Sequence, residues 1–144
     1  MPRNTPTLLL ITASAPDIQQ VRRARVLNFQ QITMPYLAAF APPHWTVRHV
    51  DEAVEPVNLD APADLVAITF HTPSAPHAYA LAGRFRQRGT TVVLGGPHVT
   101  LLPEEAQAHA NSTDDPLLHL ERNRDRRSMG SSRHDAFGAH HRGQ

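Results

Sequence analysis

Two adjacent glycines, Gly95 and Gly96, are the residues whose type and spacing point most directly to ligand chemistry. They follow an apolar run at 90–94 and precede Pro97 and His98. Because glycine has no Cβ, a flat or bulky ligand can lie directly against its backbone. A helix starting beyond the turn would add free N–H groups and a positive dipole end. The turn therefore predicts a ligand-binding surface.

Other polar residues carry weaker signals. His98 is expected either to contact a ligand or to cap the turn, and both alternatives stay open. His71 is read as a solvent-facing loop residue. Asp51 and Glu52 look like an acid/base pair, but adjacent strand residues point to opposite sides, so we expect them to cap a loop.

Composition excludes several classes of function. The 144 residues suffice for one domain with a modest core, and the net charge of +1 favours neither nucleic acid nor an anionic membrane as partner. The absence of Cys excludes disulfides, thiolate zinc sites and an iron–sulfur cluster bound by this chain. No apolar run approaches the roughly 20 residues of a membrane helix, and the start is too short for a secretory signal. We expect a cytoplasmic protein.

Four segments have the pattern of strands that could position the turn. Residues 7–13, 64–70 and 90–94 are short apolar runs, typical of strands buried on both faces of a parallel sheet. Residues 45–51 alternate apolar and polar side chains, which predicts a strand at or near an edge.

Helical signals lie between these strands. We expect a helix at 33–40, with Thr33 as its N-cap and with Tyr36, Leu37 and Phe40 on one face. A second helix is expected at 75–88, capped by Ser74. Its αL stop is Gly89, and its inner face would carry Ala78, Leu81, Ala82 and Phe85.

Two further segments connect or follow these elements. Residues 18–31 are polar and Arg-rich, and we expect a long loop with at most one helical turn. A last helix is expected at 103–110. The alternation of strands and helices predicts an α/β domain with a parallel sheet, whose ligand binds at the carboxyl ends of the strands. Those ends are residues 14–17, 51–52, 69–74 and 95–100.

The composition changes after Ala110. Only seven of the residues at 111–144 are apolar, so this segment cannot bury enough surface to offset its ordering entropy. We expect a domain at 1–110 and a disordered tail at 111–144. Its Arg cluster at 122–127 is interleaved with Asp and lacks aromatics, which disfavours nucleic-acid binding.

An ordered set of motifs across residues 7–110 resembles the N-terminal cobalamin-binding domain of B12-dependent radical SAM proteins. The matching pieces are Met34-Pro35-Tyr36-Leu37, Val50-Asp51-Glu52, Asp64-Leu65-Val66-Ala67-Ile68-Thr69, Ala78-Tyr79-Ala80, Phe85-Arg86-x-Arg88-Gly89 and Leu94-Gly95-Gly96-Pro97-His98-Val99-Thr100. Each piece is weak alone, but their order, followed by Pro103-Glu104-Glu105-Ala106, is fairly specific.

The resemblance implies a flavodoxin-like Rossmann domain, a three-layer sandwich around five parallel strands. Such a domain holds cobalamin against the strand ends, often with the dimethylbenzimidazole tail displaced into the sheet region, and passes it to a radical SAM barrel. Position by position, it implies these cofactor-binding residues: Ser14, Thr69, His71, Thr72, Gly95, Gly96, Pro97 and His98. It implies no catalytic machinery within this segment.

The chain departs from the family pattern in two places. The Asp-x-His-x-x-Gly motif of many B12 domains is absent at 14–20, which weakens a claim of His on cobalt. After Ala110, neither the expected fifth strand nor the three-Cys motif of a barrel follows. We therefore expect a sheet without its fifth strand, from a truncated or frameshifted gene. Translating the neighbouring DNA in the other two frames tests this, because one frame should restore an apolar strand followed by a Cys-rich motif.

Other readings stay open. One is an α/β domain binding a flavin or another nucleotide-type cofactor, although residues 12–20 lack the Gly-x-Gly-x-x-Gly fingerprint. Another is a non-functional fragment, whose exposed sheet edge would invite association with a partner. The sequence names no substrate.

Overall fold

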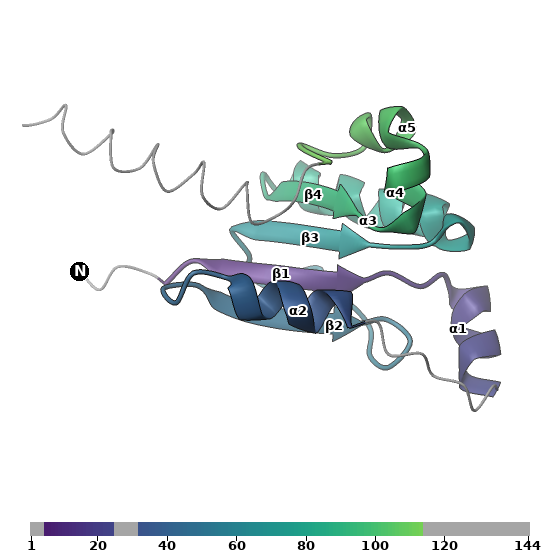
Figure 1. Ribbon diagram of the computed structural model, residues 1–144, viewed down its shortest axis with the longest axis horizontal. Coiled ribbons are helices and arrows are strands. Elements are labelled where there is room, and N and C mark those ends of the chain that lie inside the picture. Colours follow the sequence, from purple (N-terminus) through teal and green to yellow (C-terminus); the bar gives the residue numbers. More distant parts are fainter. Residues whose placement is uncertain (1–4, 25–31, 114–144) are drawn as a thin grey trace, which may run out of the picture.

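The computed structural model describes residues 5–24 and 32–113, in which four parallel strands form one sheet (Figure 1). The strands are β1 (Thr7–Thr12), β2 (Thr46–Asp51), β3 (Leu65–Thr69) and β4 (Thr91–Gly95), in the spatial order β2-β1-β3-β4. The helices are α1 (Pro16–Ala24), α2 (Thr33–Phe40), the 3-10 helix η1 (Thr72–Ser74), α3 (Ala75–Gln87), α4 (Pro97–Leu101) and α5 (Pro103–Gln107). The predicted strand order along the chain is confirmed.

The strand ends are aligned with one another. Thr12, the last residue of β1, pairs with Asp51 of β2 and with Thr69 of β3, and Thr69 pairs with Gly95 of β4. All five residues of β3 are buried, as expected for a strand between two neighbours and under two layers. The four strand exits therefore lie along one edge of the sheet, where ligands of such folds bind.

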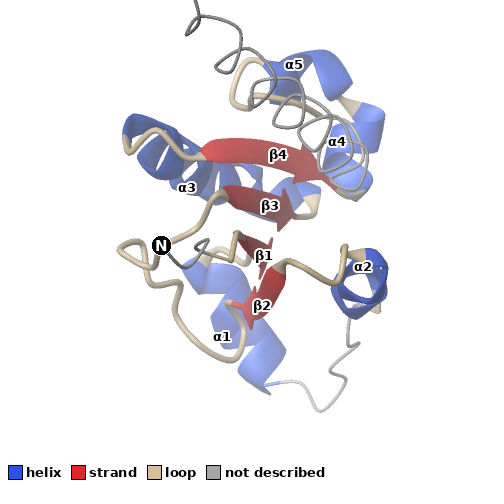
Figure 2. Cartoon of the chain, turned by 90° about the vertical axis from the view of Figure 1, so that its left-hand side faces the viewer, coloured by secondary structure: helices blue, strands red, loops and turns tan. Residues whose placement is uncertain are grey.

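Helices cover both faces of the sheet (Figure 2). On one face, the inner residues of α3 pack with alternate strand residues such as Ile68 and Leu94. On the other, Met34 of α2 packs with the intervening residues, including Leu10 and Ala67. The predicted α/β, flavodoxin-like three-layer arrangement is confirmed. None of the helices in the described ranges combines the length and hydrophobicity that a membrane-spanning helix needs.

The chain returns to β4 after α5. Ser112 forms a parallel bridge with Val93, and the Ser112 carbonyl accepts from the Leu94 N–H at 3.0 Å. The Asn111 side chain also accepts from the Val92 N–H at 2.9 Å. Residues 111–112 thus begin pairing where a fifth strand would lie. The tail from 114 onward is outside the described residues, so the boundary after Ala110 stays a prediction.

Two helix predictions were wrong. Residues 16–24 form α1 rather than a loop, because Pro16 favours the first helical position and Asp17 the positive end of the helix. Residues 25–31 lie outside the described ranges. The chain also turns helical immediately at Pro97, forming α4, before the expected last helix begins at Pro103 as the shorter α5.

The predicted caps differ as well. Neither Thr33 nor Ser74 makes a side-chain capping bond: Thr33 is already helical, and Ser74 Oγ instead accepts from the Ala15 N–H at 3.1 Å. Tyr36 and Phe40 share a face of α2 as expected, but that face is exposed. Gly89 has the expected positive φ of 80° at the end of α3.

Candidate functional site

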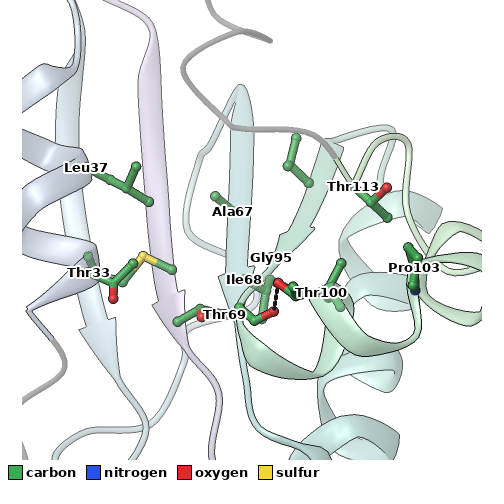
Figure 3. A pocket seen from close by; sticks show the side chains of 13 residues that line it. Thr33, Leu37, Ala67, Ile68, Thr69, Gly95, Thr100, Pro103 and Thr113 are labelled. Carbon is green, nitrogen blue, oxygen red and sulfur yellow. Dashed lines mark hydrogen bonds between the residues drawn. The ribbon is translucent and has the colours of Figure 1, made fainter.

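A cavity of about 350 Å³ opens beside the glycine turn, between α2 and the carboxyl halves of β3 and β4 (Figure 3). It is lined by Thr33, Met34, Leu37, Ala67, Ile68, Thr69, Val93, Gly95, Gly96, Val99, Thr100, Pro103 and Thr113. The lining is apolar apart from threonine hydroxyls and exposed backbone, and none of its described residues carries a charged side chain. Such a surface suits an uncharged, largely apolar group that makes a few hydrogen bonds.

The cavity's rim at Gly96 depends on the absence of a side chain. Gly96 has φ 100° and ψ −176°, a combination essentially restricted to glycine. A Cβ there would overlap Thr69 Oγ1 and press on the Phe70 backbone at 3.1 Å. Gly95 is different, because a Cβ there would meet nothing within 4 Å. Gly96 is therefore required for close packing of two strand exits, whereas Gly95 leaves open space.

His98 is held inside the protein by both ring nitrogens. Its ring is buried, with Nδ1 3.0 Å from Thr72 Oγ1 and Nε2 3.1 Å from Glu105 Oε1. These contacts join the exit of β3, the start of α4 and the start of α5. Of the two roles left open for His98, this geometry matches the one that fixes the turn.

Tyr79 of α3 completes the network around Glu105. Its hydroxyl donates to Glu105 Oε1 at 2.8 Å, and its ring stacks on His109 with centroids 4.0 Å apart. Burial, with the neighbouring Glu105 carboxylate, raises the pKa of Tyr79 to about 12. The hydrogen bonds from His98 and then Tyr79 lower the pKa of Glu105. Both effects favour a protonated phenol beside an ionised carboxylate.

A second polar cluster lies at the exits of β1 and β2. The buried Glu52 carboxylate accepts from the Ser14 N–H at 3.0 Å and from His77 Nε2 at 2.8 Å. Asp51 instead accepts from the Ala53 N–H at 2.9 Å. The two acidic residues therefore have separate partners, and each stabilises a loop, as the sequence predicted. Ser14 Oγ is buried and has no hydrogen-bond partner among the residues that the structure describes.

The structure brings together some of the predicted binding residues. Thr69, Gly95 and Gly96 line one cavity, and Thr72 contacts His98 next to it. Ser14, His71 and Pro97 do not line this cavity. His71 is exposed, as favoured from the sequence, and Pro97 is exposed at the first position of α4. All eight stay predictions as cofactor contacts.

Sequence reasoning missed the partners of these residues. Glu105 and Tyr79 appeared only as parts of motifs, and Met34 and Leu37 of α2 were not expected at the site. Their proximity depends on tertiary packing, which local patterns do not report. Within 5–24 and 32–113, no group of three His, Asp or Glu side chains is arranged to hold a metal ion.

Comparison with known proteins finds partial relatives. The chain is 46% identical over 76 residues to a bacteriochlorophyllide d C-8(2)-methyltransferase of Chlorobaculum tepidum, a match that covers 52% of this chain and 17% of that enzyme. It is 43% identical over 49 residues to the C-12(1)-methyltransferase of the same organism, covering 34% of this chain and 11% of that enzyme. No protein-family model matches. The similarity therefore relates this chain to a minor part of two methyltransferases.

The contrast between the two glycines predicts unequal effects of alanine. Gly96→Ala should lower the free energy of unfolding by about 1–3 kcal/mol, because it forces a strained φ and a side-chain overlap. Gly95→Ala should change it by less than about 0.5 kcal/mol, since the methyl group enters open space. Urea unfolding followed by circular dichroism measures both, and equal losses would contradict the assignment.

The Glu105 network predicts an acid-sensitive contribution to stability. The folded pKa of Glu105 lies below its ordinary value of 4.5, so its contribution is fully present above that value and is lost as the pH falls through the folded pKa. The difference in Tm between wild type and Glu105→Gln should therefore be constant near neutral pH and shrink below about pH 4.5. Glu104→Gln controls for the loss of one carboxylate from the same turn. A difference that grows on acidification would refute this.

Proposed function

We propose that residues 1–110 form a cobalamin-binding module related to the N-terminal domain of B12-dependent radical SAM enzymes, without catalytic machinery of its own. The observation that carries the proposal is the uncharged cavity that opens at Gly95 and Gly96 on the carboxyl edge of the sheet. The family resemblance and the two methyltransferase relatives support it independently. A cobalt corrin, when bound, supplies a centre that can carry a methyl group.

The size of the cavity indicates which part of the cofactor it could enclose. Small-molecule sites usually enclose about 300–1,000 Å³. A cavity of about 350 Å³ is at the lower end, enough for the aromatic base of a nucleotide tail but not for a corrin ring as well. Met34 and Leu37 of α2 would hold the base of the tail, and the residues at the strand exits would hold the ring.

The residues at the rim fit the chemistry of a corrin. The backbone at Gly95 and Gly96 lets a broad ring approach closely, and threonine hydroxyls can bond its amide arms. Ion pairing is not needed, since these arms are neutral. His98 fixes the turn rather than offering a free ring nitrogen, because both of its nitrogens have protein partners.

Titration with hydroxocobalamin tests the proposal. The folded chain should shift the corrin absorption bands and co-elute with the cofactor. Gly95→Val should weaken binding by at least about tenfold, or about 1.4 kcal/mol, by filling the open space beside the rim. Gly83→Ala, on α3 and also without close neighbours, is the matched control and should bind as wild type.

Parallel arms separate the alternatives. Binding of FMN with no binding of the corrin would favour a flavin site of the same fold. A folded wild-type protein that binds neither ligand would contradict the proposed cobalamin binding. An unfolding curve, followed by circular dichroism, that shows no cooperative transition would instead favour a non-functional fragment.

A further inference from the structure

Four side chains next to the cavity form a continuous hydrogen-bonded chain with the buried His98 ring inside it. Thr72 Oγ1 lies 3.0 Å from His98 Nδ1, and His98 Nε2 lies 3.1 Å from Glu105 Oε1, which also accepts from the Tyr79 hydroxyl. Thr72 is exposed at the start of η1, whereas the His98 side chain is only 4% exposed. Glu105 is exposed as well, so His98 is the one buried member of this chain, and Thr72 is its exposed end at the exit of β3.

The direction of each hydrogen bond follows from the chemistry of the groups. An ionised carboxylate only accepts, so the hydrogen between His98 and Glu105 must be on Nε2. In a neutral imidazole the other nitrogen is then an acceptor. The Thr72 hydroxyl must therefore donate its single hydrogen inward to Nδ1. Its oxygen lone pairs then remain available to accept a hydrogen bond.

We infer that Thr72 is a specificity-determining residue, held as a hydrogen-bond acceptor that selects ligands presenting an N–H donor, such as a carboxamide arm of a corrin. This inference rests on the proposed function. It assigns the direction of one hydrogen bond, with Thr72 as the acceptor and the ligand as the donor. His98 and Glu105 are positioning residues, because they act on the ligand only through Thr72.

Two further observations support this polarity. The hydrogen bond from His98 is the largest influence that lowers the pKa of Glu105, which keeps this carboxylate ionised and acceptor-only near neutral pH. Tyr79 has its pKa raised to about 12, so it remains a donor to the same oxygen. Neither partner can reverse its role without a change of protonation.

The protonated nitrogen of His98 can be measured without any cofactor. Long-range ¹⁵N–¹H correlation spectra of the folded chain near pH 8 should place the ring proton on Nε2 of His98. Glu105→Ala should allow the other tautomer to appear, whereas Glu104→Ala should not. A wild-type proton on Nδ1 would overturn the inference even if cobalamin binds.

The selection itself is tested with two corrins that both lack the nucleotide tail. Cobinamide carries carboxamide arms, while the heptamethyl ester of cobyrinic acid has no N–H donor. Wild type should bind cobinamide more tightly than the ester. Thr72→Val, which is nearly isosteric, should weaken cobinamide binding by about tenfold and leave ester binding unchanged, since one hydrogen bond is lost. Thr72→Ser should restore the preference.

The outcomes separate the two proposals. Equal loss for both corrins in Thr72→Val, or an unchanged preference, overturns the role of Thr72 while cobalamin binding stands. Binding of neither corrin by folded wild type overturns the role of Thr72, whereas absence of hydroxocobalamin binding overturns both proposals, whatever tautomer His98 adopts.

Discussion

The close approach of Gly96 to Thr69 and Phe70 is the constraint on which the site depends. It lets the chain leave β4 across the end of β3, so that α4 begins at once and places His98 beneath the turn. A side chain at Gly96 would separate these exits. The cavity rim and the Thr72–His98 contact therefore share one origin in backbone geometry.

The sheet could be predicted from the sequence because its signal is local. The apolar runs leading to Thr12, Thr69 and Gly95 need only burial on both faces to become central parallel strands, and alternation before Asp51 marks the edge strand β2. The helix α1 was missed because its residues are mostly polar and Arg-rich, although they are amphipathic, and because Pro16, which starts it, was assigned to a loop.

The site was only partly predictable. The glycine turn could be predicted, since a glycine pair after a strand permits close backbone approach, although only Gly96 requires it here. The contacts around the turn could not be predicted. Ser74 has the position of a helix cap, but its hydroxyl accepts from Ala15. Glu105 has the position of an acidic residue at a helix start, but it bonds His98 and Tyr79. Such partners come from elements far apart in sequence, so only the folded arrangement reveals them.

The parallel pairing also has a consequence for how the chain folds. Leu8 of β1 finds its partners only in Val47 of β2 and Leu65 of β3. During synthesis, an apolar strand therefore emerges first and stays unpaired until much of the domain has left the ribosome. Contacts of such long range form slowly and leave apolar segments open to aggregation meanwhile. The yield of folded protein in cells should then depend on the pace of translation and on chaperones as much as on final stability.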